Sequence, residues 1–183
     1  NIKNIVTASA GNHAQGVAYV CNQLNIKSTI YIPTITPNQK INKIKYYGDK
    51  NLDLKIIGNN FDECYNESII FSQKHNLPYV HPFNDLDTIL GQSTIVNELI
   101  NKLDNIDYLV SPVGGGGLIS GLSYIKNLKE TKLIGVEPEG ANCLQISLNN
   151  NKNIKLDKVD TFVDGASVAQ IGDINYEICK NSI

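Results

Sequence analysis

The sequence predicts an α/β fold built on a mainly parallel sheet. Short runs rich in β-branched residues alternate along the chain with stretches that have helical spacing. Strands separated by helices of this length are typical of βαβ crossovers, in which consecutive strands run parallel. A hydrophobic content of 42% and a charged content of 19% lie in the range of globular domains, so the 183 residues can form a sizeable core.

Each element follows from its local pattern. We expect strands at 5–7, 28–32, 54–57, 79–80, 108–113 and 133–136, and helices at 14–24, 39–47, 61–75, 88–103 and 119–128. Asn60 followed by Glu63 is a capping box that predicts the start of the third helix. We expect two lobes: a smaller one over residues 1–80, and an incomplete part of a larger one over residues 81–183.

Composition excludes several classes of partner. A net charge of −2 without blocks of like charge argues against nucleic acid and acidic membranes. The four cysteines are far apart and form no C-x-x-C pair, which predicts buried thiols in a reducing compartment and no metal site. We expect a cytoplasmic protein, with an organelle as the alternative. The chain begins at Asn1 and contains no Met, so we expect a piece truncated at both ends.

Two candidate ligand loops follow predicted strands, where parallel sheets place their ligands. The first is the run Ser9, Ala10, Gly11, Asn12 and His13, directly before a helix. Unpaired N–H groups at a helix start can hold a carboxylate or phosphate. Simple capping by Ser9 and Asn12 explains the same residues, and both interpretations stay open.

The second loop is the run Gly114, Gly115, Gly116 and Gly117, followed by Leu118. Four glycines cost chain entropy but leave the backbone bare, which suits N–H groups that converge on an anion. No Lys or Arg lies in the loop, so backbone dipoles alone would hold the anion. A flexible strand-to-helix turn is the structural alternative.

Nucleotide sites are the competing interpretation of the glycine run. Glu137 ends the next predicted strand, where a ribose-binding acid would lie. The third glycine of a dinucleotide fingerprint is missing, because Ile119 or Ser120 stands there. A P-loop fails as well, since no Gly-Lys-Ser/Thr follows the glycines.

Five motifs then occur in one order: residues 7–16, 81–85, 91–94, 112–118 and 164–168. Together they resemble the fold-type-II pyridoxal-phosphate enzymes of the serine/threonine dehydratase group, whose fold is like that of tryptophan synthase β. Residues 135–144 and 163–172 are most similar to the biosynthetic threonine ammonia-lyases. The resemblance implies elimination of water from L-threonine, and from L-serine, to give 2-oxobutanoate or pyruvate and ammonia, as the first step of isoleucine biosynthesis.

The resemblance also implies residue roles. The backbone from Gly114 to Leu118 would bind the cofactor phosphate, and Asn12 would hydrogen-bond the 3′ oxygen of the pyridine ring. The run from Ser9 to His13, Ala10 included, would surround the substrate carboxylate. Gly165 would lie on the substrate side. A homo-oligomer is expected for the full-length protein.

Some family features are absent or altered. The Schiff-base lysine should lie upstream of Ser9, so no catalytic residue is nominated and we expect this piece alone to be inactive. Racemases of the group carry a serine where this chain has Ala10, which favours elimination. In the group's divalent-metal segment Glu137 matches, but Cys143 stands where a carboxylate is expected, so no metal is assigned.

Three other functions stay open. A catabolic serine/threonine ammonia-lyase would differ in its regulatory domain. A non-catalytic module could keep the anion site without the chemistry and would lack the upstream lysine. A dinucleotide-binding domain would bind NAD.

Overall fold

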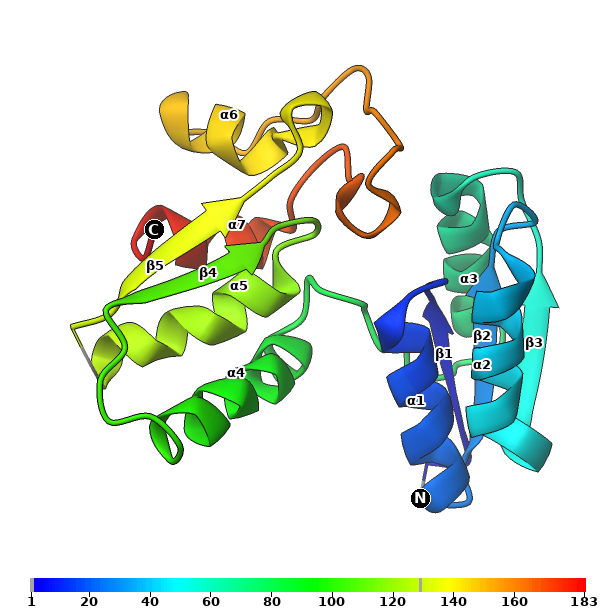
Figure 1. The fold of residues 1–183 in the computed structure, drawn as a ribbon. Helices are drawn as coiled ribbons and strands as arrows, with labels where there is room; N and C mark the ends of the chain where they lie inside the picture. The colour runs from blue at the N-terminus through cyan, green and yellow to red at the C-terminus, as the bar shows by residue number, and fades with distance from the viewer. Residues whose placement is uncertain (1, 129) are drawn as a thin grey trace. The chain divides into compact units, whose positions relative to one another are not determined.

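The computed structural model describes residues 2–128 and 130–183 and divides into two compact units, residues 1–82 and residues 83–183. Each unit contains a parallel sheet with helices packed on it (Figure 1). The predicted α/β class with parallel strands is therefore confirmed for both units. No helix among the described residues is long and apolar enough to cross a membrane.

The first unit is a three-stranded parallel sheet in the order β1-β2-β3. Its elements are β1 (Asn4–Ala8), α1 (Asn12–Gln23), β2 (Lys27–Ile32), α2 (Asn38–Gly48), η1 (Asp49–Asn51), β3 (Leu52–Ile56) and α3 (Phe61–Lys74). Tyr79 adds an isolated parallel bridge to Val6, so the strand expected at 79–80 is reduced to one residue pair.

Helices cover both faces of this sheet, as Figure 1 shows. Successive residues of a strand point to opposite faces. Ile30 and Ile32 of β2 accordingly pack against α1 and α2, while Tyr31 packs with Cys64 of α3. Every strand of the sheet ends on the same edge, and the Ser9–His13 loop follows β1 there.

The predicted capping box opens α3. The Asn60 side chain accepts a hydrogen bond from the Glu63 N–H at 2.9 Å. The Glu63 carboxylate in turn accepts from the backbone N–H of Asn59 at 2.8 Å and from the Asn60 amide at 3.0 Å. The reciprocal bond thus reaches one residue further back than a standard capping box does.

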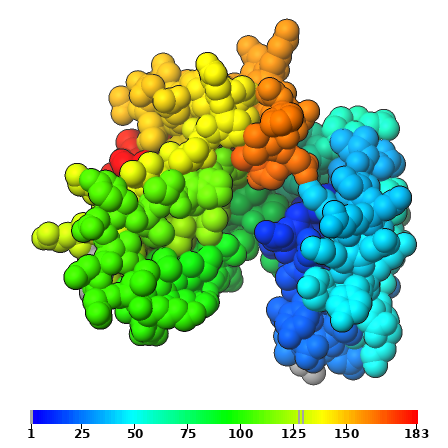
Figure 2. Space-filling view, in the orientation of Figure 1, coloured from blue at the N-terminus to red at the C-terminus, as the bar shows by residue number. Residues whose placement is uncertain are grey.

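The second unit is built on the parallel pair β4 (Tyr108–Pro112) and β5 (Lys132–Val136). Its helical segments are α4 (Leu86–Ile100), α5 (Gly117–Leu122), η2 (Ser123–Asn127), η3 (Glu139–Ala141), α6 (Cys143–Asn149), η4 (Asp164–Ala166) and α7 (Asp173–Lys180). One core joins α4, α5 and α7 through Val96, Ile119 and Tyr176. The segment between α6 and α7, orange in Figure 2, lies at the surface, and Phe162 in it is 91% exposed.

Two expectations for this unit need correction. The helix expected at 119–128 is α-helical only to Leu122 and continues as the 3-10 helix η2. The helices α6 and α7 were not predicted, because each is shorter than ten residues and offers few turns of apolar spacing. The prediction of buried free thiols is confirmed for Cys21, Cys64, Cys143 and Cys179.

Candidate functional site

The Ser9–His13 loop is held by its own side chains and by the neighbouring strand. The Ser9 N–H donates to the Tyr31 carbonyl of β2 at 3.1 Å. The Ser9 hydroxyl accepts from the Gly11 N–H at 3.1 Å. Gly11, and not Asn12, is the N-cap of α1, and no side chain caps it. Neither Ser9 nor Asn12 therefore caps the helix, and the exposed Asn12 side chain lies in its first turn.

His13 is fixed by a buried threonine. The Thr7 hydroxyl donates to the Val80 carbonyl at 2.7 Å, and His13 Nε2 lies 3.0 Å from the same hydroxyl oxygen. A hydroxyl has one proton, and the carbonyl can only accept. His13 must then carry a proton on Nε2 and donate it to Thr7. The shared Thr7 hydroxyl therefore fixes the orientation of the ring.

The glycine run lies between β4 and α5 and begins the helix. Val113 completes the strand pairing, its N–H donating to the Val136 carbonyl at 2.9 Å. Gly116 is the N-cap of α5 with φ of +93° and ψ of −6°, a left-handed conformation that L side chains rarely adopt. Its carbonyl accepts the Ser120 N–H at 2.9 Å, which closes the first turn of the helix.

Neighbouring atoms crowd all four glycines, and Gly115 and Gly116 most tightly. An added Cβ would lie 2.3 Å from the Phe83 ring at Gly115 and 2.7 Å from Ile171 at Gly116. At Gly114 and Gly117 the nearest atoms would be 3.0 Å away, on Gly165 and Phe83. Glycine-to-alanine changes would therefore crowd the protein itself.

The N–H groups of this loop fit an anion. Within the ranges that the structure describes, the N–H groups of Gly114, Gly115, Gly116, Gly117 and Leu118 donate no hydrogen bond to the protein. Gly116 and Gly117 are buried, and the loop contains no basic side chain. A run of free N–H donors on one short loop is the arrangement that holds phosphate groups. The loop therefore fits the phosphate of a cofactor.

Gly165, which is expected on the substrate side, lies beside the glycine run. It belongs to η4, and its carbonyl oxygen would be 3.0 Å from a Cβ placed on Gly114. Nothing lies within 4 Å of a Cβ on Gly165 itself. The structure thus brings Gly165 to the glycine run of the second unit, while Ser9–His13 belongs to the first unit.

Several residues around the glycine run had no role assigned from sequence. Phe83 covers Gly115 and Gly117, and Asn84 accepts the Ile174 N–H at 3.0 Å, which fixes the start of α7. Asn175 donates to the carbonyls of Gly115 and Phe83. Phe83 and Asn84 lie in the motif at 81–85 and could have been found there. Asn175 lies in no motif.

Glu137 has a structural role in the second unit. Its carboxylate accepts the N–H groups of Leu144 and Gln145 at 2.9 and 2.8 Å and so caps α6. Cys143 Sγ lies 3.8 Å from the same carboxylate. A ribose- or metal-binding role would have to compete with these bonds. Among the described residues, no group of three His, Cys, Asp or Glu side chains could hold a metal ion.

The buried cysteines are unsuited to nucleophilic catalysis. Burial raises the pKa of the Cys64 thiol to about 12. Burial and the nearby Glu137 carboxylate raise the pKa of the Cys143 thiol to about 11. Burial likewise raises the pKa of Cys179 to about 11. Thiols with such pKa values stay protonated at neutral pH, and the thiolate is the reactive form.

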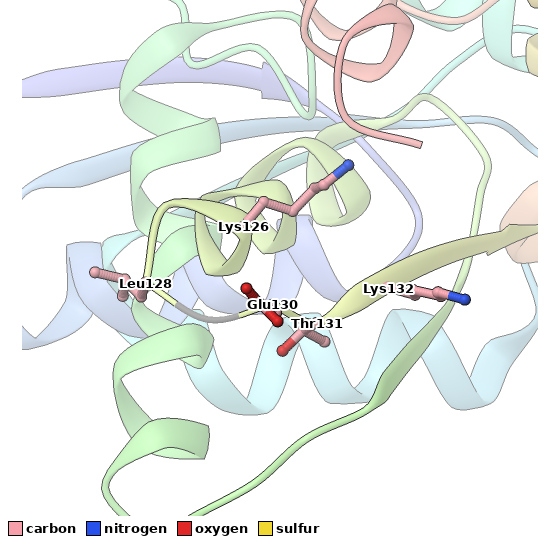
Figure 3. A pocket seen from close by; sticks show the side chains of 5 residues that line it. All are labelled: Lys126, Leu128, Glu130, Thr131 and Lys132. Carbon is pink, nitrogen blue, oxygen red and sulfur yellow. The ribbon is translucent and has the colours of Figure 1, made fainter.

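A shallow pocket elsewhere in the second unit contains none of the predicted site residues. Figure 3 shows its lining by Lys126, Leu128, Glu130, Thr131 and Lys132. Lys132 begins β5, whereas the glycine run follows the last residue of β4. Because β4 and β5 are parallel, this pocket lies at the opposite edge of the sheet.

The chain is similar to known proteins along its whole length. The family described as "Pyridoxal-phosphate dependent enzyme" matches residues 1–183. The chain is 45% identical over 188 aligned residues to "L-threonine dehydratase biosynthetic IlvA" of Staphylococcus epidermidis, covering 99% of the chain and 44% of that protein. The Staphylococcus aureus protein of the same name is 46% identical, with the same coverage. The chain thus spans less than half the length of these relatives.

A solved structure gives a similar result. The processed form of threonine deaminase isoform 2 from Solanum lycopersicum matches with a TM-score of 0.91 and 42% identity, over 100% of this chain and 53% of that one. A pyridoxal 5′-phosphate-dependent aspartate racemase also matches, with a TM-score of 0.91 and 26% identity over 56% of its length. The chain belongs to the family of pyridoxal-phosphate dependent enzymes, with the fold-type-II architecture.

Proposed function

We propose that the full-length protein is a threonine ammonia-lyase that uses pyridoxal 5′-phosphate, with L-serine as a second substrate. The observation that carries the proposal is the glycine loop, whose N–H groups are free to bind a phosphate. Its support is the family match along the whole chain together with relatives named as biosynthetic threonine dehydratases.

The glycine loop would hold the cofactor through backbone donors alone. The N–H groups from Gly114 to Leu118 would donate to the phosphate oxygens. Hydrogen bonds to a charged acceptor are about twice as strong as neutral ones. Because Phe83, Ile171 and Asn175 pack against the other side of the loop, the donors are fixed before the ligand arrives.

The first loop would bind the rest of the cofactor and the substrate. Asn12 would bond the 3′ oxygen of the ring, and the backbone from Ser9 to His13, Ala10 included, would surround the substrate carboxylate. Gly165 would border the substrate. When bound, the cofactor supplies the electron sink that makes loss of the α-proton and then of the β-hydroxyl feasible.

His13 would contribute an oriented ring at this loop. Its Nε2 proton is committed to the buried Thr7 hydroxyl, so the ring cannot rotate without breaking that bond. Thr7 is fully buried and so protects this orientation from water.

A turnover assay tests the proposal. The purified full-length protein, supplied with pyridoxal 5′-phosphate, should convert L-threonine to 2-oxobutanoate and ammonia. Ammonia should also appear with L-serine, together with pyruvate. Release of D-allothreonine or D-serine without ammonia would indicate a racemase, which Ala10 argues against. Absence of turnover with a bound cofactor would favour the non-catalytic module.

A catabolic ammonia-lyase is the second candidate for the same site. The names of the staphylococcal relatives favour the biosynthetic class. Inhibition of the full-length protein by isoleucine would support the biosynthetic class, and insensitivity would favour the catabolic one. A cytoplasmic location and a homo-oligomer stay predictions, which fractionation and sedimentation would test.

A further inference from the structure

Asn175 joins α7 to the glycine loop. Its side chain is fully buried, and Nδ2 donates to the Phe83 carbonyl at 2.9 Å and to the Gly115 carbonyl at 3.1 Å. The Gly172 N–H donates to the same Gly115 carbonyl at 3.1 Å. One carbonyl of the loop therefore receives two hydrogen bonds from the beginning of α7.

The Gly115 carbonyl determines where the next N–H group points. A peptide unit is planar and trans, so the C=O of Gly115 and the N–H of Gly116 point in opposite directions. With the carbonyl held against α7, the Gly116 N–H is directed to the other side of the loop. No acceptor in the described parts of the chain receives this N–H.

Packing supports the same orientation. A Cβ on Gly116 would lie 2.7 Å from the Cβ of Asn175 and from the side chain of Ile171, so the loop rests directly on Asn175. The amide orientation is settled, because both atoms that face Nδ2 are carbonyl oxygens and can only accept. Oδ1 is buried without a partner among the described residues. Asn175 therefore acts through the two N–H donors of its Nδ2 group.

The geometry points to Asn175 as the positioning residue of the phosphate-binding loop. This inference rests on the proposed function, because its ligand is the cofactor phosphate. Asn175 acts through the backbone: it fixes the Gly115–Gly116 peptide so that the N–H faces the phosphate. Its removal should weaken binding of the phosphorylated cofactor far more than binding of the same ring without phosphate.

The test uses two matched variants of the full-length protein, Asn175→Leu and Asn153→Leu. Asn153 also donates through Nδ2 to the start of α7, at 3.0 Å to the Ile171 carbonyl and 2.6 Å to Asp173 Oδ1, and its Oδ1 is likewise buried without a partner among the described residues. Neither of its acceptors belongs to the glycine loop. Equilibrium dialysis gives the Kd of pyridoxal 5′-phosphate and of pyridoxal, and Tm is recorded without cofactor.

The ratio of the two dissociation constants decides the outcome. Asn175→Leu should raise the Kd of pyridoxal 5′-phosphate about 10- to 100-fold, the range expected for a lost bond to a charged group, with little change for pyridoxal. Asn153→Leu should keep the wild-type ratio even if its Tm falls as far. An unchanged ratio in Asn175→Leu, or an equal change in both variants, would overturn the inference.

A second variant covers the case in which Asn175→Leu does not fold. Asn175→Ala removes the same donor without adding bulk against the two carbonyls. It should show the same selective loss of affinity for pyridoxal 5′-phosphate. A wild-type ratio of the two dissociation constants in this variant would refute the role. If the wild-type protein binds no pyridoxal 5′-phosphate, the proposed function fails, whereas wild-type binding with an unaffected variant removes only the role of Asn175.

Discussion

Gly116→Ala should destabilise the second unit through two separate effects. The residue has φ of +93°, and an L side chain in the left-handed region costs about 1–2 kcal/mol. The new Cβ would also lie 2.7 Å from the Cβ of Asn175 and from Cγ1 and Cδ1 of Ile171. Overpacking of this kind costs about 1–3 kcal/mol, so the expected total is about 2–5 kcal/mol.

Urea unfolding of the cofactor-free, full-length protein measures this loss of stability. The transition is monitored through the unfolding of the second unit. Gly91→Ala is the matched control, because Gly91 lies inside α4 with nothing within 4 Å of an added Cβ. That change should stabilise the protein by about 0.5–1 kcal/mol. Adding Ile171→Val to Gly116→Ala should recover part of the packing cost. A Gly116→Ala variant as stable as the wild type would refute the described loop conformation.

Three further changes test other parts of the structure. Asn60→Ala removes the N-cap of α3 and should lower the free energy of unfolding by about 1 kcal/mol, measured by urea denaturation. Thr7→Val removes the hydroxyl that pairs with the Val80 carbonyl and with His13 Nε2, and should lower the free energy of unfolding by about 1–3 kcal/mol. Urea denaturation measures this loss, and an unchanged stability would contradict the two hydrogen bonds. Burial raises the pKa of Cys143 and Cys179 from 9.0 to about 11. The contribution of the two protonated thiols to stability is therefore complete below pH 9 and is lost as pH rises toward 11. Unfolding midpoints that stay constant between pH 9 and pH 11 would contradict this prediction.

The sequence was sufficient for the features that depend on neighbours along the chain. The alternation of β-branched and helical runs predicted β1 to β5, and the Asn60–Glu63 spacing predicted the start of α3. The position of the glycine run between a strand and a helix was predicted for the same reason. Each of these signals lies within a few residues and needs no tertiary partner.

Features that depend on distant contacts could not be predicted. The short helices α6 and α7 are stabilised by a core shared with α5, and their own sequences carry little periodicity. Asn175 binds a carbonyl 60 positions earlier in the chain, which no local pattern indicates. Likewise, Gly115 and Gly116 are crowded by Phe83 and Ile171, which lie far from the loop in sequence.

A crystal structure of the full-length protein with its cofactor tests the central claim most directly. The measured quantities are the distances from the phosphate oxygens to the backbone nitrogens of Gly114 to Leu118. We predict several N–H···O distances of about 2.7–3.2 Å, with no lysine or arginine of the loop involved. A phosphate bound elsewhere, with these N–H groups facing water, would contradict the assignment of the glycine loop as the cofactor's phosphate site.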